Sequence, residues 1–154
     1  MKRNDLRMAA AGTVAAMTIG GAAVLGTTTA QAQDNGHRLA GTWVVTVQPL
    51  EGPNKTPFES RIAYTTTGSV VEATSRAPMS AGLGTWKRLG SGRFTTTVEK
   101  YRFNGPMYIG KTVIQEVQEL SADGSKYTGQ ATTTIVNNDG TRVTFRSTST
   151  GHRA

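Results

Sequence analysis

The chain has 154 residues, a net charge of +7 and no cysteine. The lack of cysteine excludes disulfides, thiolate catalysis and cysteine metal ligands, so an exported form would depend on its hydrophobic core. Basic residues are interleaved with acidic ones, which favours a solvated surface over the alternative of attraction to anionic partners such as cell-wall polymers. Nucleic-acid binding is not expected, because neither a basic run nor an aromatic platform is evident.

Residues 1–32 have the layout of a secretory signal peptide. A positively charged start precedes an apolar stretch of small residues over 8–26, and Ala30-Gln31-Ala32 matches what a signal peptidase requires. An uncleaved membrane anchor is the alternative, but four glycines dilute the hydrophobicity of the stretch. We expect cleavage after Ala32, a secreted, periplasmic or cell-envelope location, and no stable membrane insertion afterwards. Residues 33–154 then form a single domain.

The rest of the chain reads as strands separated by turns. Residues 39–47 alternate apolar and polar side chains with the period of two that is typical of a strand. Gly90-Ser91-Gly92 and Asn104-Gly105-Pro106 are typical of tight turns, as are two Asp-Gly pairs, while residues 49–57 form the longest loop. The predicted strands cover 39–47, 58–67, 70–76, 83–89, 93–103, 107–120, 125–136 and 141–149.

One segment, 107–120, has two interpretations. Val113, Ile114, Val117 and Leu120 have helical spacing, whereas β-branched residues and hairpin turns at both ends favour a strand, which we prefer. Eight consecutive strands can close on themselves, and closure removes the exposed sheet edges. The sequence therefore predicts an all-β fold, an eight-stranded antiparallel up-and-down barrel, expected as a monomer or weak dimer.

Short motifs at the two ends of this meander resemble a known group of barrels. Gly41-Thr42-Trp43 on the first strand and Arg153 after the last strand resemble the lipocalin-like, or calycin, group. The block 84–88, Gly-Thr-Trp-Lys-Arg, resembles small exported bacterial proteins that are assigned to such folds. The resemblance implies that Trp43 packs at the closed end of the barrel, where Arg153 stacks over the indole and hydrogen-bonds to the backbone.

Catalytic motifs are not evident in the sequence. Nucleophile-elbow, phosphate-loop and dinucleotide-binding patterns are absent from it. His37 and His152 lie beside the termini, where a metal or acid–base pair is an alternative to the favoured interpretation of loose terminal residues. We therefore expect neither a metal nor a cofactor.

Polar groups inside the barrel are the remaining catalytic candidates. If the odd-numbered face of 93–103 points inward, Glu99 and Tyr101 reach the cavity, and a buried Glu99 could donate a proton, because burial raises a carboxyl pKa. The favoured alternative is that Glu99 pairs with Arg88 or Arg102 outside the barrel. Glu72 and Glu116 share this ambiguity.

The strands contain small residues, which predicts an incompletely filled interior. We expect an exported barrel that binds a small, mainly apolar molecule. A cofactor-free cyclase or isomerase acting on a hydrophobic substrate is the alternative, and a structural or inhibitory protein acting through its loops, chiefly 49–57, is a third. The small residues are Gly84, Thr97, Gly129, Ala131 and Thr133, and the predicted pocket walls are Tyr64, Trp86, Tyr101, Tyr108 and Tyr127.

Overall fold

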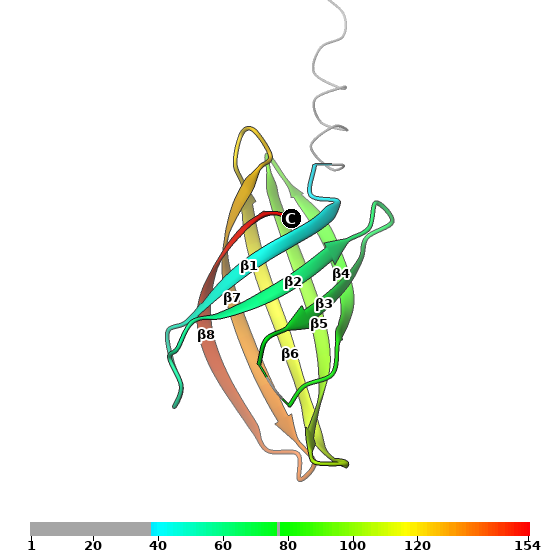
Figure 1. The fold of residues 1–154 in the computed structure, drawn as a ribbon, viewed down its shortest axis with the longest axis vertical. Helices are drawn as coiled ribbons and strands as arrows, with labels where there is room; N and C mark the ends of the chain where they lie inside the picture. The colour runs from blue at the N-terminus through cyan, green and yellow to red at the C-terminus, as the bar shows by residue number, and fades with distance from the viewer. Residues whose placement is uncertain (1–37, 77) are drawn as a thin grey trace, which may run out of the picture.

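A computed structural model describes residues 38–76 and 78–154. These residues form eight antiparallel strands that close into a barrel, each strand pairing with its neighbours in the sequence (Figure 1). The predicted all-β fold is confirmed, whereas the predicted signal peptide and His37 lie outside the described residues. The strands are β1 (Gly41–Pro49), β2 (Phe58–Tyr64), β3 (Ser69–Thr74), β4 (Gly82–Gly90), β5 (Arg93–Asn104), β6 (Met107–Leu120), β7 (Lys126–Asn137) and β8 (Arg142–Arg153).

The barrel closes where β1 pairs with β8. Trp43 lies opposite Arg153, and Pro49 lies opposite Ser147. β8 continues beyond the predicted end of this strand at residue 149, so Arg153 is the last residue of the strand and not a residue after it. The prediction ended too early because the extra residues are held by backbone pairing with both β1 and β7, which the local sequence does not reveal.

Residues 107–120 form a single strand, β6, and the helical alternative is wrong. β6 pairs with β5 on one side and β7 on the other. Thr112, Ile114, Glu116 and Gln118 face the interior with a period of two, while Val117 is exposed on the outer face. Two flanking strands satisfy the backbone of β6, and this pairing outweighs the helical spacing of its apolar residues.

Two Asp-Gly pairs form turns, as predicted. Gly124 and Gly140 have φ values of 72° and 82°, in the left-handed region that favours glycine. The carboxylate of Asp123 accepts a hydrogen bond from the Ser125 N–H at 3.1 Å, and Asp139 accepts one from the Thr141 N–H at 2.9 Å. These side chains stabilise the chain reversals at β6–β7 and β7–β8.

Aromatic side chains pack the core at one end of the barrel. The rings of Trp43 and Tyr127 are 5.1 Å apart, and those of Trp86 and Phe94 are 5.7 Å apart. Both indole N–H groups are satisfied by backbone carbonyls: Trp43 donates to Leu39 and Trp86 donates to Thr65, each at 2.8 Å. This end of the barrel is therefore filled by side chains.

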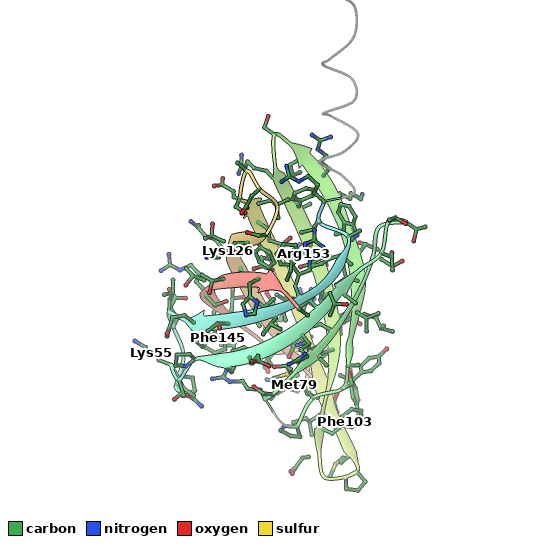
Figure 2. All side chains as sticks on the ribbon, turned by 45° about the horizontal axis from the view of Figure 1, so that its top comes forward. Lys55, Met79, Phe103, Lys126, Phe145 and Arg153 are labelled. Carbon is green, nitrogen blue, oxygen red and sulfur yellow. The ribbon has the colours of Figure 1, made fainter. Side chains whose placement is uncertain are left out.

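Arg153 covers the filled end. Its guanidinium lies 4.5 Å from the centre of the Trp43 ring and donates to the backbone carbonyls of Ala40, at 2.7 Å, and Arg38. A Cβ at Gly41 would stand 2.6 Å from the guanidinium, so glycine leaves the space that Arg153 occupies. These are the contacts that the lipocalin-like resemblance implies, and the barrel is compatible with that fold. Figure 2 shows Arg153 at this end and Phe103 toward the other.

Candidate functional site

The barrel encloses a cavity of about 260 Å³. The aromatic core does not line it, and the cavity extends from that core toward the opposite end. There its lining includes Gly52 and Asn54 of the β1–β2 loop and Met79 of the β3–β4 connection. One end of the barrel is thus filled, while the interior toward the other end has room for one small molecule.

The wall of the cavity is mainly aliphatic. Ala131 and Thr133 are small inward-facing residues of β7, and they leave space as predicted. Thr97 and Gly84 do not add space to the cavity. Thr97 is exposed, and a Cβ at Gly84 would collide with the Thr97 carbonyl, so this glycine instead permits close approach of β4 and β5. The aliphatic residues that line the cavity include Val45, Val47, Ile62, Val98, Ile114 and Ile135.

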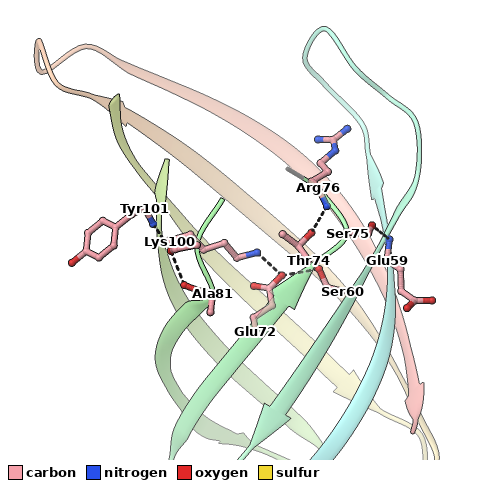
Figure 3. A network of polar contacts seen from close by, with 10 residues as sticks. Glu59, Ser60, Glu72, Thr74, Ser75, Arg76, Ala81, Lys100 and Tyr101 are labelled. Carbon is pink, nitrogen blue, oxygen red and sulfur yellow. Dashed lines mark hydrogen bonds and ion pairs between the residues drawn. The ribbon is translucent and has the colours of Figure 1, made fainter. Parts of the chain in front are cut away.

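A buried ion pair lies on one side of the cavity (Figure 3). Lys100 Nζ of β5 is 2.7 Å from Glu72 Oε1 of β3, and only 2% and 6% of the two side chains are exposed. The Ser60 hydroxyl donates to the same carboxylate oxygen at 2.7 Å. A Cβ at Gly82 would stand 3.0 Å from the Lys100 stem, so this glycine gives the lysine room. Charge and hydrogen bonding are therefore compensated within the pair.

A second buried carboxyl, Glu116 of β6, belongs to a hydrogen-bonded network. The Ser149 hydroxyl donates to Glu116 Oε1, and Gln118 Nε2 donates to Glu116 Oε2 at 2.9 Å. Gln118 Nε2 also donates to the Tyr64 hydroxyl at 2.6 Å. A Cβ at Gly129 would collide with both Glu116 and Ser149, so the missing side chain on β7 makes room for this contact.

The environment of Glu116 changes its acidity. Burial raises the pKa of the Glu116 carboxyl to about 7, the hydrogen bond from Ser149 opposes this rise, and the Glu72 carboxylate adds to it. Burial also raises the pKa of the Tyr64 and Tyr127 hydroxyls, which therefore stay neutral. Glu116 can exchange a proton near neutral pH, as a general acid or base must.

The Thr112 hydroxyl also lies inside the barrel. Thr112 is 2% exposed and lines the cavity, and its Oγ1 has no hydrogen-bond partner among the described residues. A buried polar atom left without a partner costs about 1–3 kcal/mol. In β6, Thr112 is nearer the open end than Glu116, and it pairs in register with Lys100 of β5. A polar group of a bound molecule could complete this hydrogen bond.

Arginines lie at the mouth of the cavity. Arg146 of β8 donates to Glu51 of the β1–β2 loop at 2.7 Å, which joins that loop to the barrel. The guanidinium of Arg76 lies 4.4 Å from the centre of the Phe58 ring and donates to the Asn54 carbonyl at 3.2 Å. The predicted surface loop is therefore the rim of the cavity.

The five predicted pocket aromatics do not line the cavity. Tyr64, Trp86 and Tyr127 point inward but are buried in the aromatic core at the filled end. Tyr101 and Tyr108 lie outside the barrel, 52% and 44% exposed, where their rings contact each other at 5.9 Å. The expectation that these aromatics form the wall is wrong, because three of them fill the closed end and two lie outside; the aromatic residues that do line the cavity are Phe58 and Phe145.

The catalytic candidates Glu99 and Tyr101 are on the outer face of β5. Glu99 pairs outside the barrel, as favoured, but its partner is Lys111 of β6 at 2.8 Å and not Arg88 or Arg102. Figure 3 shows Lys100 extending toward Glu72 while the Tyr101 side chain points away. Neither Glu99 nor Tyr101 lines the cavity, so the inward orientation of this face is wrong.

The sequence alone does not decide which face of 93–103 points inward. Phe94 and Val98 share a face with Lys100, while Tyr101 and Phe103 share the other face with Thr95, Thr97 and Glu99, so each face carries two large apolar or aromatic side chains. Glu72 and Glu116 were candidates with two orientations, and the structure places both inside. No feature of the sequence indicated that the Thr112 hydroxyl lies in the cavity without a hydrogen-bond partner among the described residues.

Other kinds of site find no support in residues 38–76 and 78–154. That part of the chain contains no group of three or more histidine, aspartate or glutamate side chains that could hold a metal ion. It also contains no helix with the length and hydrophobicity to cross a bilayer. His152 is exposed on β8. No protein family, curated protein or solved structure matches the chain.

Proposed function

We propose that this protein binds a small, mainly apolar molecule with a polar group inside its barrel. The cavity of about 260 Å³ carries this proposal, because an aliphatic wall surrounds a few buried polar groups: Glu72, Lys100, Glu116 and Thr112. Ligand pockets commonly combine such a wall, which buries the ligand body, with a few polar groups that orient it. The aromatic core, whose rings meet edge to face or tilted, closes one end, so the ligand would enter from the end of the β1–β2 loop.

Titration with a neutral apolar fluorophore, N-phenyl-1-naphthylamine, tests this proposal. We expect saturable binding with a Kd near micromolar, about −8 kcal/mol. Ala131→Phe would place a ring in the cavity and weaken binding about tenfold or more, a loss of about 1.4 kcal/mol. Ala63→Phe is the matched control, because Ala63 is on β2 and does not line the cavity. Unsaturable binding, or equal effects of the two variants, would contradict interior binding.

Native mass spectrometry of protein purified from its own host would identify the ligand. A retained molecule should appear as a stoichiometric mass increment that disappears on denaturation. Ala131→Phe should lose this increment while Ala63→Phe keeps it, since only Ala131 lines the cavity.

A cofactor-free isomerase or cyclase is the second candidate function. Glu116 favours it, because a carboxyl with a pKa of about 7 beside an apolar cavity can donate and accept protons at neutral pH. The test is to incubate the recovered ligand with the protein in D₂O and follow carbon-bound deuterium by mass spectrometry. Incorporation that Glu116→Gln abolishes supports the enzyme; unchanged ligand supports binding alone.

The layout of residues 1–32 supports the further proposal that the protein acts after export. A structural or inhibitory role of the β1–β2 loop would be favoured instead if no apolar probe bound, since Glu51 and Asn54 place this loop at the rim. Fluorophore titration therefore separates interior binding from a function of the loop surface.

A further inference from the structure

The charges inside the barrel do not balance when both buried acids are ionised. Glu72 has a cationic partner in Lys100, 2.7 Å away. Glu116 is hydrogen-bonded by the neutral side chains Ser149 and Gln118, and it takes part in no ion pair among the described residues. A buried carboxylate without a cation is costly. The interior therefore has a place for one positive charge at Glu116.

The position of Glu116 gives a ligand access to that carboxyl. Glu116 lines the cavity, and the space beside it exists because residue 129 is glycine. Nearer the mouth on the same strand, Thr112 presents a buried hydroxyl that has no partner among the described residues. The two groups point independently to a bound molecule with polar groups, and the one that would meet Glu116 must reach deep into the barrel.

We propose that the ligand is an amphipathic organic amine, with its ammonium group bound to the Glu116 carboxylate and its hydrocarbon part against the aliphatic wall. This inference rests on the proposed binding function and specifies its ligand class. An ammonium group supplies the missing charge and donates up to three hydrogen bonds. A second donor group on the ligand, between the mouth and the ammonium group, can donate a hydrogen bond to the Thr112 hydroxyl.

An amphipathic carboxylic acid fits this interior less well. Of the described residues that line the cavity, the cations are Lys100, Arg76 and Arg146, and Lys100 is already paired with Glu72. A carboxylate placed deep in the barrel would face Glu116 without a free cation. A carboxylate held by Arg76 at the mouth would lay its hydrocarbon tail along the aliphatic wall but would bring no polar group to the buried Glu116 carboxyl, which would then stay without a charged partner.

Amine binding should be coupled to release of a proton. The titratable groups that interact electrostatically with Glu116 from neighbouring elements are Tyr64 of β2, Glu72 of β3 and Tyr127 of β7, and Lys100 of β5 lines the same cavity. Both tyrosines stay neutral because burial raises their pKa values, and Glu72 and Lys100 are paired with each other. Glu116 is therefore the group that must lose its proton before an ammonium ion binds.

The experiment compares octylamine, octan-1-ol and octanoate by isothermal titration calorimetry with residues 33–154. At pH 8 octylamine should bind about tenfold or more tightly than the alcohol, because it forms a charge-assisted hydrogen bond. With a Glu116 pKa of about 7, octylamine should bind roughly 100-fold more weakly at pH 5, while the alcohol changes little. At pH 7, buffers of different ionisation enthalpy should reveal release of about half a proton per amine.

A charge-neutral variant tests the role of Glu116 directly. Glu116→Gln should remove the advantage of octylamine over octan-1-ol and its pH dependence, while binding of the alcohol shows that the barrel is folded. Glu119→Gln is the matched control, because Glu119 is on the same strand and its side chain is 66% exposed.

The outcomes separate this inference from the proposed function. If the alcohol or octanoate binds as tightly as octylamine, or if the amine releases no proton, the ligand class is wrong and interior binding stands. If none of the three compounds binds, the inference is wrong, and the fluorophore titration decides separately whether interior binding stands. Proton release in the unmodified protein needs no variant, so the test does not depend on the folding of Glu116→Gln.

Discussion

The stability of this barrel should decrease as Glu116 ionises. The pKa of Glu116 is raised from an ordinary value of 4.5 to about 7, chiefly by burial. The folded state thus holds the proton more tightly than the unfolded chain does. The stabilisation from the protonated carboxyl is complete below pH 4.5 and is lost as the pH rises to about 7.

The size of this effect follows from the change in pKa. Since one pKa unit corresponds to about 1.4 kcal/mol, a rise from 4.5 to about 7 corresponds to about 3 kcal/mol. Glu116 is 7% exposed, so solvent screening reduces this value little. A loss of about 3 kcal/mol is a large part of the stability of a small domain.

Urea unfolding between pH 4 and pH 8 measures the effect, with fluorescence of the buried Trp43 and Trp86 as the signal. Because other groups also titrate, the informative quantity is the free energy of unfolding of the wild type minus that of Glu116→Gln. This difference should fall by about 3 kcal/mol between pH 4.5 and pH 7 and then stay constant. Glu119→Gln should parallel the wild type.

A difference that is constant with pH would refute the reasoning, because it would mean that Glu116 has the same pKa in the folded and unfolded states. A difference that rises with pH would also refute it, since the ionised form would then be favoured by folding. Either result would also remove the basis for proton release on amine binding.

Three further predictions concern other parts of the molecule. Trp43→Ala should lower the free energy of unfolding by about 3–5 kcal/mol, because it removes a core aromatic side chain. Arg153→Ala should lower it by less, with about 0.5–2 kcal/mol coming from the lost cation–π contact. An unchanged melting temperature for Arg153→Ala would contradict this role. Lys100→Met should lower the free energy of unfolding by about 3–5 kcal/mol, because it leaves the buried Glu72 carboxylate unpaired. The double variant Lys100→Met with Glu72→Gln should recover most of that loss. Chemical unfolding of both variants measures this, and a double variant as unstable as the single one would count against the pairing. The intact mass of the exported protein should correspond to a chain that begins at Gln33. A membrane-bound product that retains Met1 would exclude cleavage.

The sequence alone determined the strands and their order. Period-two alternation, β-branched residues and glycine turns are local signals, and they located all eight strands, including 107–120 with its helical spacing. The short motifs Gly41-Thr42-Trp43 and Arg153 likewise led to the contact that closes one end. These features could be predicted from the sequence because the strands depend on neighbouring residues. The contact between the first and last strands is one that the lipocalin-like resemblance implies.

Only the tertiary structure decided what lies inside the barrel. A strand has two faces, and the sequence left the orientation of 93–103, Glu72 and Glu116 open. Lys100 and Glu72 are inside, where β5 and β3 bring Lys100 Nζ within 2.7 Å of Glu72 Oε1. The aromatic residues lie in the closed end, and the cavity lies where Ala131, Thr133 and aliphatic residues meet. Room for the Glu116 carboxyl depends on Gly129 of the adjacent strand. Such contacts join residues far apart in the chain, so no local pattern records them.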